Sequence, residues 1–188
     1  MSNPAILSKL RTELSALPAP ASWIQLEQLP YLSAVIEEGN RLSFGVTARK
    51  ARIAHEPLTY TPSQHAIPSG TSKSYLRPPG TPVSITILSS HTADSVFPDP
   101  YTFDPERWLG TAGRERRRFQ MAWGKGGRKC LGIDVGRAEL YLVAAALARG
   151  FDMTLLETDE SDVAFKPDYQ VSMPKLDSKG LRVMARTL

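Results

Sequence analysis

The sequence has little cysteine and little histidine. Its 188 residues include one cysteine and three histidines. A single thiol cannot form an internal disulfide, which favours an intracellular protein over a secreted one. The histidines, His55, His65 and His91, are too far apart to give a spacing typical of zinc sites. These scarcities argue against a disulfide-stabilised scaffold and against a zinc-binding module.

Long hydrophobic runs and strong net charge are also missing. The longest apolar run, Leu140 to Ala148, is about half of the roughly 20 residues that span a bilayer. The N-terminus is polar and periodic, unlike a signal peptide, so we expect no membrane anchor in this chain. The net charge of +4 is far from that of a basic nucleic-acid binder. An apolar content of 41% suffices for the core of one or two small domains.

Hydrophobic periodicity predicts helices on either side of an irregular middle that is rich in proline and glycine. The expected helices cover residues 4–16, 30–42 and, after Cys130, a long stretch to Arg149 that Gly150 caps. The alternation in residues 81–88 predicts a half-buried strand. Short extended pieces are expected in residues 44–60 and in the tail from Phe151, where residues 177–180 form a turn.

Two further segments are expected to be loops. The prolines of residues 97–108 argue against helix and sheet, so this loop must be held by side-chain contacts. The basic run at residues 113–118 is interpreted as a solvated loop. Together the elements predict a mixed fold, mainly α with small β-sheets.

The one cysteine lies in the stretch WGKGGRKCLG, residues 123–132, which we name the cysteine loop. Glycines and three basic residues precede an expected helix start, and all of these features favour a thiolate at Cys130. A nucleophile would need a nearby histidine base, and a redox pair would need a second cysteine. An axial haem ligand needs one thiolate alone. An inert buried cysteine is the plain alternative.

This stretch resembles the haem-binding signature of the cytochrome P450 family. The matching residues are Gly126, Arg128, Cys130 and Gly132, with Trp123 where the family usually has phenylalanine. Two further stretches follow the family's order. EEGNR resembles its Glu-x-x-Arg helix through Glu38 and Arg41, and FDPERW resembles its Pro-Glu-Arg-Phe loop through Arg107.

The resemblance implies a role for each of these residues. Cys130 would be the axial thiolate on the iron of haem b, within a loop shaped by Trp123, Gly126 and Gly132. The haem propionates would meet Arg128 and Arg52, with Arg49 as the alternative to Arg52. His91 would either assist a propionate or cap a turn. The residues Glu38, Arg41 and Arg107 would form a buried network, although a pair at positions i and i+3 is also common on helix surfaces.

The implied activity is that of a monooxygenase which inserts one oxygen atom from O2 into a small apolar organic substrate, in the manner of fungal secondary metabolism. Electrons would come from an NADPH-dependent flavin reductase, steered by the basic residues around the cysteine loop. Nucleic acid is not an expected partner. Family members usually sit at the endoplasmic reticulum membrane, whereas this chain is expected to carry no anchor.

The resemblance covers residues 1–188 as the C-terminal part of the P450 fold, and we expect the N-terminal part of the usual domain to be absent. No oxygen-activating distal residue is therefore assigned. The competing hypothesis is a truncated, non-catalytic fragment that binds haem weakly or acts as an interaction module. Exposed apolar faces are expected on Ile6, Leu10 and Leu14 and along Leu140 to Leu147. Residues 44–47 and 171–174 are expected to contact substrate.

Overall fold

The computed structural model describes residues 3–62 and 73–188. Its α-helices there are α1 (Pro4–Leu14), α2 (Trp23–Leu26), α3 (Pro30–Leu42), α4 (Ile87–His91), α5 (Gly110–Arg116) and α6 (Ile133–Gly150). Its strands are β1 (Arg52–Ile53), β2 (Leu58–Tyr60), β3 (Tyr75–Arg77), β4 (Pro82–Val83), β5 (Phe151–Leu155) and β6 (Val183–Thr187). Short 3-10 turns lie at Pro105–Trp108, Arg117–Phe119, Gly126–Arg128 and Glu160–Asp162. This mixture confirms the predicted fold class.

Helices α1, α2, α3 and α6 pack together and enclose the main hydrophobic core. Leu10 and Leu14 of α1 meet Leu32 and Ile36 of α3 at helical spacing. The start of α3 has no cap from its own side chains, and Glu13 of α1 supplies one instead. Both of its carboxylate oxygens accept backbone N–H bonds, from residues 31 and 32, at 2.8 Å. This contact fixes α3, the helix that carries the predicted Glu-x-x-Arg pair, against α1.

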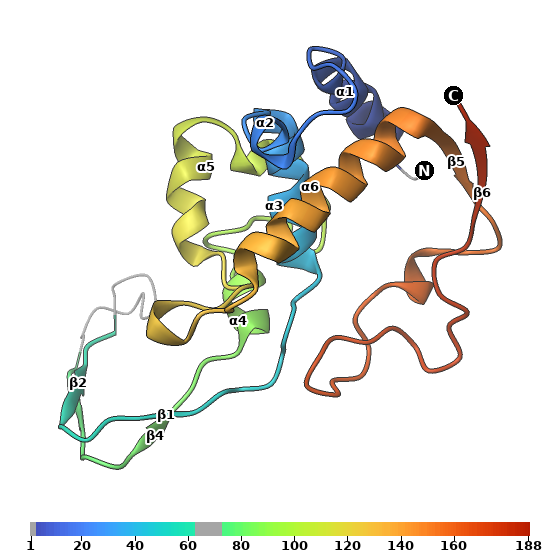
Figure 1. Cartoon of the computed structure of the whole chain (residues 1–188). Helices are drawn as coiled ribbons and strands as arrows, with labels where there is room; N and C mark the ends of the chain where they lie inside the picture. Colours follow the sequence, from blue (N-terminus) through green and yellow to red (C-terminus); the bar gives the residue numbers. More distant parts are fainter. Residues whose placement is uncertain (1–2, 63–72) are drawn as a thin grey trace.

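Two arms extend from the helical part (Figure 1). The first, which we name the ribbon, consists of β1 paired antiparallel with β4 and β2 paired antiparallel with β3. The second is the C-terminal tail, where β5 pairs antiparallel with β6 from Phe151↔Thr187 to Leu155↔Val183. Every residue of β1 to β4 is exposed, so the ribbon adds little to the core.

Several predicted elements are wrong in detail. The strand predicted over residues 81–88 is extended only at Pro82–Val83, and its end belongs to α4, because Val83 and Ile85 are exposed and give a strand no buried face. The basic run 113–118 is not a loop, since it forms the end of α5 and the following 3-10 turn, although residues 114, 115, 117 and 118 are exposed as expected. Helix α6 includes Gly150. Arg11 caps its last turn by donating to the Ala148 carbonyl at 2.9 Å.

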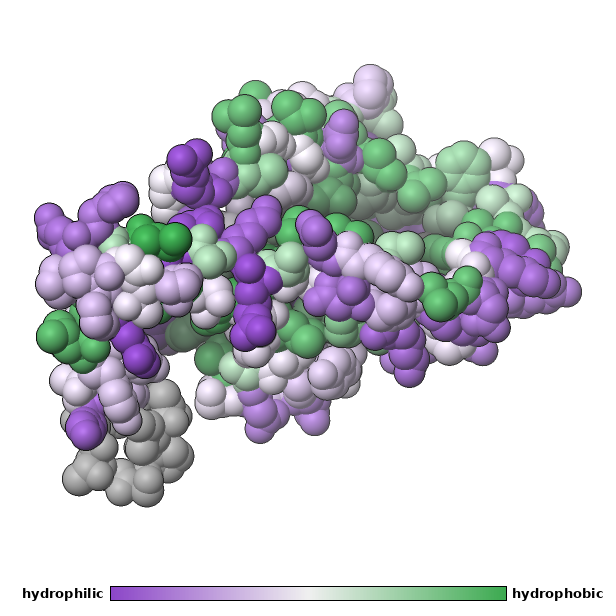
Figure 2. Space-filling view, turned by 90° about the horizontal axis from the view of Figure 1, so that it is seen from below, coloured by the Kyte–Doolittle hydropathy of each residue, from purple (hydrophilic) through white to green (hydrophobic). Residues whose placement is uncertain are grey.

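The predicted apolar surfaces divide into one buried and one exposed face. The face of Ile6, Leu10 and Leu14 is not exposed, because it packs against α3 and α6. The outer face of α6 is exposed, as predicted. Its exposed side chains include Leu140, Leu142, Val143 and Leu147. Figure 2 shows groups of hydrophobic residues on the surface seen from below. Within the described residues, no helix is both long and apolar enough to cross a membrane.

Candidate functional site

The carboxylate of Glu38 lies at the centre of a buried polar network. It is fully buried on α3, and the described structure gives it five donors. Arg41, one helical turn on, donates from Nε to Oε2 and from Nη2 to Oε1, both at 2.8 Å. Arg107 Nε and the Asp104 backbone N–H each donate to Oε1 at 3.0 Å. Trp108 Nε1 donates to Oε2 at 2.8 Å. We name Glu38, Arg41, Arg107 and Trp108 the Glu38 network.

The two arginines of the network also hold the backbone of residues 97–108, which we name the proline-rich loop. Arg41 donates to the carbonyls of His91, Pro100 and Thr102. Arg107 donates to the Pro98 carbonyl at 3.0 Å. The guanidinium groups thus satisfy carbonyls of a loop that has little regular structure of its own. This is the side-chain support that its sequence predicted.

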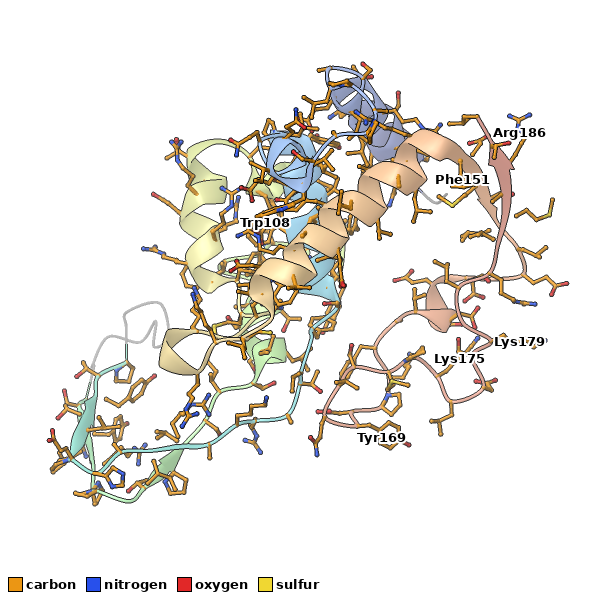
Figure 3. The ribbon with its side chains drawn as sticks, viewed as in Figure 1. Trp108, Phe151, Tyr169, Lys175, Lys179 and Arg186 are labelled. Carbon is orange, nitrogen blue, oxygen red and sulfur yellow. The ribbon has the colours of Figure 1, made fainter. Side chains whose placement is uncertain are left out.

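Trp108 is a member of the network that sequence analysis missed. It is buried, its ring centroid lies 5.7 Å from that of Phe97, and Figure 3 shows it in the interior of the helical part. A buried indole N–H needs an acceptor, so a tryptophan directly after Arg107 was an available signal. Its backbone also excludes side chains from Gly113, where a Cβ would lie 2.0 Å from the Trp108 carbonyl carbon.

The electrostatics of Glu38 combine two opposed effects. Burial alone would raise its pKa, but hydrogen bonds from Arg41, the Asp104 amide and Trp108 outweigh burial and lower the pKa below its ordinary value. Both side-chain oxygens are saturated with donors, which is the condition under which a buried ion pair holds its geometry. The network is thus a buried set of ion pairs that fixes the proline-rich loop against α3.

His91 lies next to this network and contacts the backbone of Arg41. It ends α4 and is fully buried. Its Nδ1 lies 2.8 Å from the Arg41 carbonyl, and the Met121 backbone N–H donates to Nε2 at 2.8 Å. Burial lowers the His91 pKa from 6.5 to about 4. Because both ring nitrogens have backbone partners, none is left for a propionate, and we remove His91 from the proposed haem contacts.

The cysteine loop is shaped by two left-handed glycines and a packed indole. Gly124 and Gly126 have φ of 69° and 73°, which favour glycine. The Cys130 N–H donates to the Trp123 carbonyl at 2.8 Å and closes the loop on itself. The Trp123 ring covers Gly136 in α6, where a Cβ would lie 2.7 Å from the ring. Trp123 therefore anchors the loop to the helix that follows it.

Cys130 is exposed at the end of this loop. Lys125, Arg128 and Lys129 are exposed beside it in the sequence, as are Gly126 and Gly132. The inert buried cysteine considered as an alternative is therefore not what the structure has. An accessible thiol among cations suits coordination of a metal centre that carries its own negative groups.

Arg49 and Arg52 lie apart from the loop in the contacts that the structure describes. Both are exposed, and Arg52 begins β1 in the ribbon. Arg52 Nη1 donates to the carbonyls of its neighbours Lys50 and Ala51 at 3.4 and 3.3 Å. Among the described residues, no hydrogen bond or ion pair joins either arginine to the cysteine loop. Within residues 3–62 and 73–188, neither arginine is paired with an acidic side chain, so both guanidinium groups could bind an anion.

The two segments predicted to contact substrate lie side by side. Ser172 Oγ donates to the Ser43 carbonyl at 2.6 Å, and the Ala48 N–H donates to the Gln170 carbonyl at 3.3 Å. The rings of Phe44 and Phe165 are 5.8 Å apart. The turn after α3 and the tail therefore form one surface, although they are far apart in sequence.

These features define a protein with one accessible thiol, a glycine-rich loop around it and a buried network of charged side chains elsewhere in the helical part. A family model described as Cytochrome P450 matches residues 1–179. The chain belongs to the cytochrome P450 family.

Similar proteins agree with this assignment. The chain is 42% identical to cytochrome P450 monooxygenase sdnE of Sordaria araneosa, over 97% of this chain and 35% of that protein. It is 40% identical to tryptophan 6-hydroxylase fscE of Fusarium equiseti, over 97% and 35%. A retinoic acid-bound cyanobacterial CYP120A1 structure has a TM-score of 0.76 and 28% identity, over 100% of this chain and 40% of that one. The chain spans about a third of the length of these curated relatives.

The family implies a haem iron cofactor, and the donor set of this chain fits that group. A haem of this kind requires one thiolate for its iron and cations for its two propionates. Cys130 supplies an exposed thiol, and Arg128, two residues earlier, supplies an exposed guanidinium. The described residues contain no group of three or more His, Cys, Asp or Glu side chains that could hold a metal ion.

Proposed function

We propose that this chain is the haem-thiolate part of a cytochrome P450 monooxygenase, with Cys130 as the axial ligand of haem b. The observation that carries the proposal is the exposed Cys130 at the end of a loop that is anchored by Trp123. When bound, a thiolate-ligated haem supplies activation of O2 and transfer of one oxygen atom to an organic substrate. The fungal monooxygenase relatives support a role in secondary metabolism. A small apolar organic molecule is the substrate that we propose.

The chain's own residues would bind and orient the group. Arg128 would pair with one propionate, and Arg52, or Arg49 in its place, with the other. Gly126 and Gly132 flank Cys130 without side chains that could crowd the thiol. The Glu38 network would hold α3 and the proline-rich loop behind this surface. The two neighbouring segments at residues 44–47 and 171–174 would contribute to the substrate side.

An acidic electron donor fits the basic surface near the cysteine loop. A cavity of about 180 Å³ lies between α3, Trp123 and α6, and its lining includes Arg117, Lys125 and Arg137. Glu37 lines the same cavity, and Arg137 lies 3.8 Å from Glu27. The cations still outnumber the acid at the cavity, which favours docking of a negatively charged protein by electrostatic steering. An NADPH-dependent flavin reductase is the partner we propose. We expect its productive docking to weaken as ionic strength rises.

The test is a reduced carbon monoxide difference spectrum of the chain loaded with haem. Wild type should give the thiolate-type band, and Cys130→Ser should lose it while the far-ultraviolet circular dichroism stays the same. Lys129→Ser changes the neighbouring residue in the same way and should keep the band. A Cys130→Ser spectrum that matches wild type would refute the assignment of the ligand.

A further inference from the structure

His91 links the end of α3 to the chain that leads into the cysteine loop. Its Nε2 accepts the Met121 N–H at 2.8 Å, so the ring proton is on Nδ1, where it is donated to the Arg41 carbonyl at 2.8 Å. One neutral tautomer therefore satisfies two backbone groups that are 80 positions apart in sequence. The Arg41 carbonyl lies in the last turn of α3, where it also accepts the Phe44 N–H at 3.4 Å, and Met121 lies outside any helix or strand.

A second contact holds the same short segment from the other side. Phe44 and Gly45 both have left-handed φ, 55° and 52°, directly after α3. A Cβ on Gly45 would lie 3.1 Å from the Ala122 carbonyl oxygen, so the two backbones are in close approach. Phe44 is buried with its ring 6.5 Å from that of His91. Residues 121–122 are thus held between His91 and the turn after α3.

Residues 121–122 lead directly into the cysteine loop. Trp123 follows directly, and its carbonyl accepts the Cys130 N–H at 2.8 Å. The path from Arg41 through His91, Met121 and Trp123 to Cys130 is therefore made of short hydrogen bonds and adjacent residues. A displacement of Met121 would be transmitted to the carbonyl that closes the cysteine loop.

We propose that His91 is a positioning residue that sets the cysteine loop in register with the end of α3. The thiol of Cys130 thereby takes a fixed place relative to the Glu38 network. The inference depends on the proposed function only where it treats Cys130 as the iron ligand. The placement of the loop is a property of the chain itself and is tested without haem.

The test compares backbone hydrogen exchange in haem-free wild type, His91→Gln and His91→Asn. The glutamine amide reaches the position of Nε2 and keeps an acceptor for Met121, whereas asparagine reaches only the position of Nδ1. We expect His91→Asn to speed exchange at the Met121 and Cys130 amides by about tenfold or more, the size of one lost hydrogen bond. His91→Gln should restore most of the protection, and amides within α6 should not change.

Three results would overturn the inference. Exchange at Met121 and Cys130 could be the same in all three proteins. Exchange could instead rise equally in α6, which would make His91 an ordinary core residue. Finally, glutamine could fail to protect better than asparagine.

A second readout uses the haem-loaded proteins. His91→Asn should show a smaller thiolate-type band with carbon monoxide than His91→Gln, although Cys130 is intact in both. Equal bands in the two variants would count against a positioning role. A wild type without any thiolate band, but with the expected exchange pattern, would refute the proposed function and support the placement of the loop.

Discussion

Replacing Glu38 with alanine should destabilise the chain by about 3–5 kcal/mol, the usual result of removing one partner from a buried ion pair. The change removes the acceptor of five donors, of which Arg41 Nη2 keeps the Thr102 carbonyl. The other four lose the acceptor without a replacement: the Nε atoms of Arg41 and Arg107, the Trp108 indole and the Asp104 amide. Each unsatisfied buried donor costs about 1–3 kcal/mol. Both arginines keep their hydrogen bonds to backbone carbonyls. We therefore expect the summed cost of these donors to lie near the lower end of its range.

The adjacent residue provides a matched control on the same helix. Glu37 is half-buried and accepts from Gln120 Nε2 at 3.1 Å, so Glu37→Ala removes the same charge and one hydrogen bond. We expect it to cost about 1 kcal/mol or less. Urea denaturation followed by circular dichroism gives both free energies of unfolding.

The comparison has a clear failing result. If Glu38→Ala lies within about half a kcal/mol of Glu37→Ala, Glu38 does not act as the centre of a buried network. Should the alanine variant not fold, Glu38→Gln keeps one acceptor oxygen and the shape of the side chain. It should then fold with an intermediate loss of stability, and a stability equal to that of wild type would contradict the reasoning.

Three further predictions use the same urea assay. Burial is the main cause that lowers the pKa of His91 from 6.5 to about 4. Between these two pH values the unfolded chain binds more protons than the folded chain, so the free energy of unfolding should fall by about 3 kcal/mol as the pH drops from 6.5 to 4. The variant His91→Gln should lack this part of the pH dependence. Trp108→Phe should cost about 1–2 kcal/mol for one lost donor to Glu38, and an unchanged midpoint would show that the indole bond is dispensable. Gly113→Ala should cost about 3 kcal/mol or more because its Cβ would meet the Trp108 backbone at 2.0 Å, whereas Gly39→Ala, with nothing within 4 Å, should be neutral or stabilising.

Features with a local signal were predictable from the sequence. Helices α1, α3 and α6 have apolar residues at helical spacing, with Pro4 and Pro30 in the first turns of α1 and α3. The pairing of Glu38 with Arg41 follows from their i and i+3 positions. The spacing of Cys130 within its loop pointed to the family that the comparisons then showed.

Features that depend on distant contacts were not predictable in the same way. Helix α5 exists because Arg116 donates to the carbonyls of Val96 and Arg107 and because Gly113 admits the Trp108 backbone. None of this is visible in a run of arginines, which on its own resembles a solvated segment. The burial of His91 likewise requires the Arg41 carbonyl and the Met121 amide, which come from two other parts of the chain.

The ribbon leaves the helical part after α3 and returns at α4 close to where it began. The hydrogen bond between His91 Nδ1 and the Arg41 carbonyl joins the two ends of this segment, which are 50 positions apart. The entropic contribution to the free energy of closing a flexible loop rises only with the logarithm of the loop's length, by about 0.6 kcal/mol for each doubling. Residues added to or removed from the ribbon should therefore change the free energy of unfolding by tenths of a kcal/mol. Similar changes in residues 97–108 would displace the carbonyls that the two arginines hold. Length variation between relatives should accumulate in the ribbon and be rare in the proline-rich loop.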